Sequence, residues 1–197
     1  MPKVTDEYRE AKRLEITHAA MRAFHRRGFQ GTSMADIIAE SGLSAGAIYG
    51  HFRGKSEIVL AVAQEVVGAR IGEVGELLRQ RPMPAPATVI RILMDGMFRD
   101  VGSPQMLVQL WGEAVTEPAV LELARGVLER LRSVYAGYIA AWQQQEHGLS
   151  EKEAAAIAAS QVTLFVAAAQ GFILQAALVA DFDREAFLTT LEKYLPR

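Results

Sequence analysis

TSMADIIAESGLSAGAIYGHFRGK, residues 32–55, carries the signals for two short helices separated by a tight turn. Ser33, followed three residues later by Asp36, is the pattern of a capping box that begins a helix, and Gly42 suits the left-handed residue that ends one. Ser44 is a favourable N-cap for the second helix. Two helices joined so closely are typical of a helix-turn-helix, which presents its second helix to the major groove of DNA.

Apolar residues on both sides of this segment recur at helical spacing, and no stretch alternates convincingly with period two. Breaks rich in glycine and proline divide the chain into about nine helices. We place these helices near residues 6–27, 34–41, 45–51, 55–80, 86–101, 104–116, 118–146, 150–180 and 184–195. The sequence therefore predicts an all-α fold.

The chain has 197 residues, no cysteine and a formal net charge of −2. The lack of cysteine excludes a disulfide scaffold, a cysteine zinc site and a thiol nucleophile. The N-terminal segment is charged where a secretory signal would be apolar, so we expect a cytoplasmic protein. Residues 1–60 carry nine Lys and Arg against seven acids, and the remainder has a net charge of −4, which slightly favours a polyanionic partner for the N-terminal part.

Catalytic, nucleotide and metal motifs are weak in this sequence. Gly50, Gly54 and Lys55 approach a phosphate-binding loop, but three residues separate the glycines where that motif has four. His18 and His25 lie seven residues apart, about 10 Å along a helix, which is too far to share one metal ion. We expect no metal and no cofactor. The alternative function is a small helical enzyme or carrier that acts on an apolar small molecule.

The segment 38–52, followed by Lys55, resembles the N-terminal signature of the TetR family of transcriptional regulators. The same pattern includes the preceding pairs Ala23-Phe24, Gly28-Phe29 and Thr32-Ser33. The resemblance implies a homodimeric repressor that binds a double-stranded DNA operator and responds to a small-molecule effector. It also implies two domains, a helix-turn-helix DNA-binding domain over 1–54 and a ligand-binding and dimerisation domain over 55–197.

By this resemblance the DNA contacts come from the two short helices and the start of the next one. Thr32 and Ser33 match phosphate contacts at a helix N-terminus, where backbone amides and the helix dipole favour an anion. Tyr49 and His51 match positions that touch the DNA backbone, and Lys55 matches a phosphate-binding lysine. The complete expected set is Thr32, Ser33, Ser44, Ala45, Gly46, Ala47, Tyr49, His51 and Lys55.

The second short helix also departs from the family pattern. Ala45, Ala47 and Gly50 stand where many relatives have long polar side chains, so few side chains can contact base edges directly. Gly46 and Gly50 each cost about 1 kcal/mol of helix propensity relative to alanine, which indicates either close approach of this helix to DNA or a packing requirement. Sequence recognition would then depend on thymine methyl groups, on Tyr49 and on DNA shape.

The resemblance puts the effector cavity within the helices between residues 55 and 180. The candidate lining residues are the methionine and aromatic side chains of these helices, although each is also compatible with ordinary core packing. With Gln109 as a polar candidate, they are Met94, Met97, Phe98, Gln109, Trp111, Tyr135, Tyr138, Trp142, Phe165 and Phe172. No basic cluster accompanies them, so we expect a largely apolar, neutral or weakly polar effector, anchored by Gln109, Tyr135 or Tyr138. The helix from Lys55 to about Gln80 would connect the cavity to the DNA-binding part.

Residues 154–180 contain no charged side chain. Because alanine is barely apolar and three glutamines interrupt this segment, we expect a buried helix and no membrane partner. A helix that is apolar on nearly all sides usually needs a second subunit to cover it, and family members pair their last two helices as a four-helix bundle. The dimer interface is therefore predicted at Phe165, Ala169, Phe172, Ala176, Leu188 and Leu191.

Overall fold

The computed structural model describes residues 5–116 and 118–195. These residues form nine α-helices and no strand, which confirms the all-α prediction, and the bounds differ from those expected by at most three residues. The helices are α1 (Asp6–Arg27), α2 (Met34–Ser41), α3 (Ala45–Tyr49), α4 (Lys55–Leu77), α5 (Pro86–Val101), α6 (Pro104–Thr116), α7 (Pro118–His147), α8 (Glu151–Leu178) and α9 (Arg184–Tyr194).

Local capping explains where the first helices begin and end. Gly28 ends α1 and Gly42 ends α2 with φ angles of 71° and 67°, a region that favours glycine. Ser33 and Asp36 form the expected capping box at α2, and the Ser44 side chain accepts a hydrogen bond from the Ala47 amide at the start of α3. The short-range chemistry of the sequence thus determines the helix-turn-helix.

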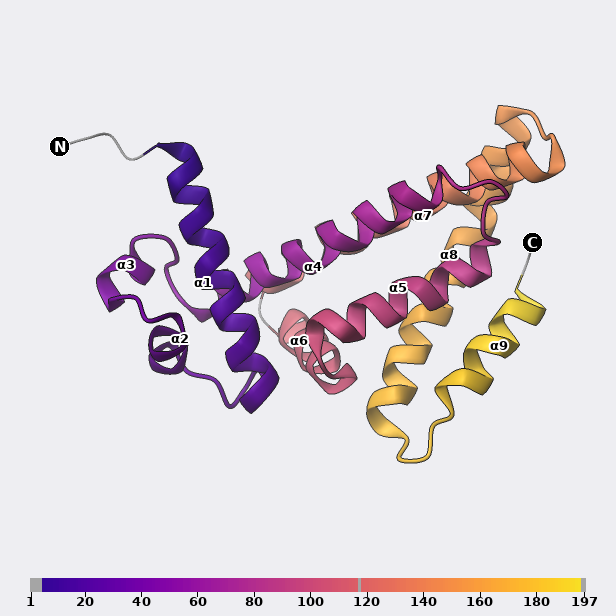
Figure 1. The fold of residues 1–197 in the computed structure, drawn as a ribbon. Helices are drawn as coiled ribbons and strands as arrows, with labels where there is room; N and C mark the ends of the chain where they lie inside the picture. Colours follow the sequence, from indigo (N-terminus) through magenta and orange to yellow (C-terminus); the bar gives the residue numbers. More distant parts are fainter. Residues whose placement is uncertain (1–4, 117, 196–197) are drawn as a thin grey trace.

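Helices α1, α2 and α3 form a head at one end of the molecule, and α4 extends from this head into the body (Figure 1). The head core contains the buried faces of all three helices together with the first half of α4. Its largest members are Ile16, Phe24, Phe29, Ile37, Ile48, Phe52, Ile58 and, from α6, Met106. The boundary expected between residues 54 and 55 coincides with the start of α4, but α4 itself completes the head.

The body consists of α4 to α9. Helix α7 packs against α4, α6 and α8, and α9 packs against α5 and α8. The rings of Phe98, Phe172, Phe182 and Phe187 meet between α5, α8 and α9, with centroid distances of 5.4 to 5.6 Å. Arg91 of α5 adds ion pairs to two carboxylates of α9. These contacts position α9 against the body without a second subunit.

Helix α8 has the length and composition of a membrane-spanning helix, the only such helix within the described part of the chain, with a mean hydropathy of 1.7 over its most apolar window. The core helix of a folded protein meets the same criterion. Helix α8 packs against α6, α7 and α9, and Phe165 and Phe172 on its inner face are buried. The apolar composition of α8 therefore serves packing on its inner face.

Two tyrosines of α7 hold the segment that leads into α5. Tyr138 donates a hydrogen bond of 2.7 Å to the Pro84 carbonyl, and Tyr135 donates one to the Pro86 carbonyl. Burial raises the pKa of Tyr138 to about 12 and that of Tyr135 well above its usual value, so both phenols remain protonated donors at neutral pH.

We expect Tyr138→Phe to lower the free energy of unfolding by about 1 to 2 kcal/mol, because the carbonyl of the half-buried Pro84 loses its donor. Urea denaturation followed by circular dichroism measures the change. Tyr49→Phe is the matched control, since Tyr49 is exposed on α3 and its hydroxyl should contribute little to stability. Equal stability of the two variants would contradict the assigned hydrogen bond.

Candidate nucleic-acid interface and effector cavity

Helix α3 is attached to the head by one side of the helix. Ile48 is fully buried in the head core, whereas Ala45, Gly46, Ala47 and Tyr49 are exposed. Tyr49 has the largest of these exposed side chains, with 52% of its surface accessible. The outer face of α3 is therefore smooth and accessible over its whole length, with one aromatic side chain near its end.

The packing explanation for Gly46 is excluded within the described chain. A methyl group at Gly46 would meet no atom within 4 Å, so no neighbour requires a glycine there. At Gly50 a methyl group would lie 3.3 Å from the Gly46 carbonyl oxygen and 3.4 Å from that of Ala47, which is a tight contact. Packing thus explains the glycine at position 50, whereas Gly46 leaves the α3 backbone open to a partner.

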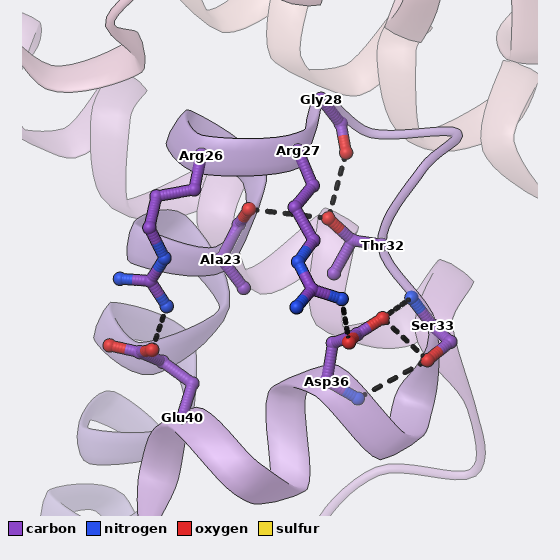
Figure 2. Close-up of polar contacts among 8 residues, drawn as sticks. All are labelled: Ala23, Arg26, Arg27, Gly28, Thr32, Ser33, Asp36 and Glu40. Atoms are coloured by element: carbon purple, nitrogen blue, oxygen red, sulfur yellow. Dashed lines mark hydrogen bonds and ion pairs between the residues drawn. The ribbon is translucent and has the colours of Figure 1, made fainter.

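Ion pairs between α1 and α2 neutralise much of the positive charge of the head (Figure 2). Arg22 and Arg26 both pair with Glu40, and Arg27 pairs with Asp36. The Ser33 hydroxyl and amide hydrogen-bond Asp36, and these bonds lower the pKa of its carboxyl group. These arginines fix α2 against α1, so the excess positive charge noted in the sequence is largely used inside the head.

The Thr32 side chain, expected beside a DNA phosphate, is buried and bonded within the chain instead. Thr32 is 1% exposed, and its hydroxyl donates to the Gly28 carbonyl at 2.7 Å and lies 3.3 Å from the Ala23 carbonyl, at the C-terminal end of α1 (Figure 2). Its amide donates to the Phe29 carbonyl. The neighbouring Ser33 is exposed and caps α2. Thr32 closes the turn after α1, and a phosphate contact at this position stays a prediction for Ser33 alone.

The loop after α3 is held by cation–π contacts. The Arg13 guanidinium lies 4.3 Å from the centre of the Phe52 ring and donates to the His51 carbonyl at 2.8 Å. The Lys55 ammonium lies 4.1 Å from the centre of the Phe29 ring at the start of α4. His51 and Lys55 are half-buried beside the exposed face of α3, and their contacts with DNA stay predictions.

A cavity of about 230 Å³ lies in the body between helices α4, α5, α6, α7 and α8. This volume exceeds that of an apolar protein cavity of about 150 Å³ that binds benzene. Five of the ten expected effector residues line it: Met94, Met97, Trp111, Tyr135 and Phe165. The remaining lining consists mainly of valine and leucine side chains of α4 and α7, which the sequence argument missed because it considered only methionine and aromatic residues.

The other five expected effector residues lie elsewhere. Phe98 and Phe172 stack in the aromatic cluster beneath α9, and Trp142 packs edge-on against His147. Tyr138 uses its hydroxyl on the Pro84 carbonyl, and the Tyr135 hydroxyl is similarly engaged although its ring lines the cavity. Gln109 is exposed, and its Oε1 lies 3.7 Å from where a methyl group at Gly28 would be. None of the three expected polar anchors therefore presents a polar group to the cavity.

The head core and the cavity share their walls. Val59, Val62 and Val66 of α4 are buried in the head core and also line the cavity. Val101 at the end of α5 and Met106 in α6 do the same. Since each of these side chains contacts both regions, a change in the shape of the cavity acts directly on residues that support the head.

Three of the six expected interface residues are core residues of a single chain. Phe165, Phe172 and Leu188 are buried, and Ala169 lines the cavity. Ala176 and Leu191 are half-buried. The prediction was wrong for the buried residues because an apolar helix does not reveal which of its faces the rest of the chain covers.

The outer face of α8 instead carries a separate apolar stripe. Its residues recur every three or four positions along one side of the helix. They include Leu174 and Leu178, which are 43% and 70% exposed, and smaller side chains that permit close approach. The stripe consists of a half-buried glycine, Gly171, and the exposed residues Ala156, Ser160, Thr163, Ala167, Leu174 and Leu178.

Comparison with known proteins finds a family match for part of the chain. Residues 16–62 match the family model described as "Bacterial regulatory proteins, tetR family". The regulator TtgR of Pseudomonas putida is 44% identical over 62 residues, which are 32% of this chain and 30% of TtgR. The segment matched to TtgR thus spans less than a third of that relative, and the family match over residues 16–62 runs from within α1 to the first turns of α4.

Solved structures match over nearly the whole chain. A TetR-family transcriptional regulator of Syntrophomonas wolfei str. Goettingen has a TM-score of 0.70 at 16% identity, covering 94% of this chain and 93% of that one. The multidrug binding protein EbrR, complexed with ethidium, has a TM-score of 0.65 at 20% identity, covering 92% and 96%. At these identities the likeness shows a shared fold. These proteins are regulators or binding proteins rather than enzymes. Residues 16–62 therefore match the tetR family of bacterial regulatory proteins, and the described residues share the fold of solved TetR-family regulators.

Proposed function

We propose that this protein is a transcriptional repressor that binds a two-fold symmetric DNA operator as a dimer and is released by a small, largely apolar molecule. The observation that carries the proposal is the combination of a one-sided α3 with a cavity that shares its walls with the head core. A helix that buries only Ile48 in the head has its outer face available for the major groove.

DNA recognition by this α3 would depend on surface shape more than on hydrogen bonds to bases. Ala45 and Ala47 offer methyl groups that fit beside thymine methyls, and Gly46 lets the backbone approach the groove floor. Tyr49, Ser33 and Lys55 would contact phosphates and set the position of the helix. Since few side chains carry direct base contacts, DNA shape would contribute much of the specificity.

Dimerisation would bury the outer stripe of α8 against the same stripe of a second copy. A two-fold interface requires a surface that is complementary to itself, and a helix with small residues in the middle and leucines at one end satisfies this requirement. The neighbouring Leu164 is 50% exposed beside the stripe and would add apolar area. Two heads related by the dimer axis would then contact two half-sites.

Release from DNA would follow from the walls that the cavity and the head share. His25 at the end of α1 lies with its Nε2 2.7 Å from the Asp100 carbonyl near the end of α5, so α1 also contacts the body through α5. A molecule that fills the cavity would move α4 and α5 and change the position of the head relative to the dimer axis. EbrR, which has the same fold, is known in complex with ethidium, which supports a small-molecule site in this fold.

We expect Ala47→Glu to reduce affinity for a DNA fragment from the protein's own upstream region at least about tenfold. A carboxylate on the outer face of α3 repels phosphates by about 1 to 4 kcal/mol at contact distance. Gln144→Glu is the control, because it changes the net charge equally at an exposed position near the C-terminal end of α7, and that end of α7 lies far from α3 (Figure 1). Mobility shift in low salt measures both. Equal retardation by the two variants would rule out α3 as the DNA-binding helix.

We expect Ala169→Phe to abolish saturable binding of the neutral dye Nile red, because the added ring occupies the cavity that Ala169 lines. Fluorescence titration measures the binding, and circular dichroism checks that the variant is folded. Ala11→Phe, on an exposed position of α1, is the control and should bind the dye like the wild type. Unaltered binding by the Ala169 variant would place the dye site outside the cavity.

We expect the wild type to be a dimer of about 43 kDa, twice the chain mass of 21.6 kDa, and Leu174→Glu to be a folded monomer. A charge at the leucine end of the α8 stripe would be buried without a partner in the dimer. Light scattering at micromolar concentration measures the molecular mass. Gln144→Glu, which also adds one negative charge, is the control. A wild type of 21.6 kDa, or a Leu174 variant that stays dimeric, would contradict the assigned interface.

A further inference from the structure

One charged side chain interrupts the apolar wall of the cavity. Arg70, in the second half of α4, is 3% exposed and is the only charged residue in the cavity lining formed by the described residues. Burying a guanidinium is costly unless its donors are satisfied, so such a residue in an otherwise apolar wall requires an explanation.

Only part of the Arg70 guanidinium has partners in the chain. Its Nη2 lies 2.8 Å from Asp100 Oδ2 and 3.1 Å from Glu73 Oε1. Its Nε and Nη1 are buried and have no acceptor among the described residues. Glu73 Oε2 is also buried without a donor, but Glu73 does not belong to the lining. The two carboxylates therefore hold the guanidinium in place and leave two of its nitrogen donors unused.

The charges around Arg70 already balance. Arg99 Nη2 lies 3.1 Å from Glu73 Oε1, and Arg99 Nε lies 3.9 Å from Asp100 Oδ1. Two arginines thus face two carboxylates. A further carboxylate in the cavity would leave the cluster with a net negative charge in apolar surroundings, and a cation would be repelled by the guanidinium that lines the wall. An uncharged acceptor avoids both costs.

The opposite helix makes room for this arrangement. A methyl group at Gly96 of α5 would collide with Nη1 and Cζ of Arg70. At Gly72 of α4, in contrast, a methyl group would meet no atom within 4 Å. The absence of a side chain at position 96 therefore allows the guanidinium to lie between α4 and α5 at the cavity wall.

We infer that Arg70 is the polar anchor of the effector and that the effector is an apolar molecule with an uncharged hydrogen-bond acceptor, such as a ketone, ester or amide oxygen. The inference rests on the proposed effector function of the cavity. The unused donors of Arg70 bind this oxygen, and the aliphatic walls bind the apolar remainder. On α4 the lining extends from Ser56 to Arg70, about 21 Å along the helix axis, which suits an extended molecule.

Four naphthalene probes of similar size test this assignment without DNA. Acetonaphthone carries an uncharged carbonyl, isopropylnaphthalene has no acceptor, naphthoate is an anion and naphthylmethylammonium is a cation. Displacement of prebound Nile red gives the dissociation constant of each probe. We compare the affinity for acetonaphthone with the affinity for isopropylnaphthalene in each protein. We expect this ratio to be about tenfold higher in the wild type than in a variant that lacks the anchor.

Arg70→Lys removes the two unused donors but retains a positive charge for Asp100 and Glu73. Gly96→Ala displaces the guanidinium by steric contact and leaves Arg70 in the sequence. Gly72→Ala, on the exposed side of α4, is the matched control for the glycine change. We expect the preference for acetonaphthone to disappear in Arg70→Lys and to fall in Gly96→Ala, while isopropylnaphthalene binds all four proteins similarly and Gly72→Ala behaves like the wild type.

The outcomes separate this inference from the function on which it rests. If the probes bind and the acetonaphthone preference is the same in Arg70→Lys and the wild type, Arg70 is not the anchor although the cavity binds ligands. If naphthoate or naphthylmethylammonium binds most tightly, the assignment of an uncharged effector is overturned. If the wild type binds no probe and no Nile red, the effector function of the cavity fails and the inference fails with it.

Discussion

Helix α4 is packed against two cores at once, and the other features of the protein depend on this constraint. Its valines at positions 59, 62 and 66 complete the hydrophobic core of the head and form one wall of the cavity. A side chain that serves two cores cannot change its position in one without affecting the other, because protein interiors are closely packed. The head core and the cavity are therefore joined by direct packing through α4.

Some polar side chains form contacts that fix the head, and others keep donors that remain available for a partner. The arginines of α1 are used on the carboxylates of α2, and Thr32 closes the turn between these helices. These bonds make the head rigid but leave little charge for DNA, so α3 presents methyl groups, a bare glycine backbone and one tyrosine. In the body the situation is reversed, since the cavity-lining residue Arg70 is fixed by carboxylates at one nitrogen and keeps two buried donors without an acceptor among the described residues.

The two faces of α8 have different functions. The inner face packs Phe165 and Phe172 into the body, and the outer face exposes small residues and leucines. The amino-acid composition of α8 is apolar and does not distinguish these two faces, which is why α8 has the mean hydropathy of a membrane-spanning helix. The fold assigns the bulky aromatic residues to the chain's own core, and the small residues that precede Leu174 and Leu178 on the outer face leave room for the close approach of another helix.

The sequence by itself determined the elements that depend on nearby residues. Capping by Ser33, Ser44 and the glycines at 28 and 42 is decided within a few positions, so the helix bounds and the exposed face of α3 followed from spacing alone. Only the tertiary structure decided which side chains line the cavity, where Thr32 points and which face of α8 is exposed. Helical periodicity identifies an apolar face but not its neighbour, and the ion pair of Arg70 with Asp100 joins residues 30 positions apart. Such pairs arise from the packing of α4 against α5, which no local pattern encodes.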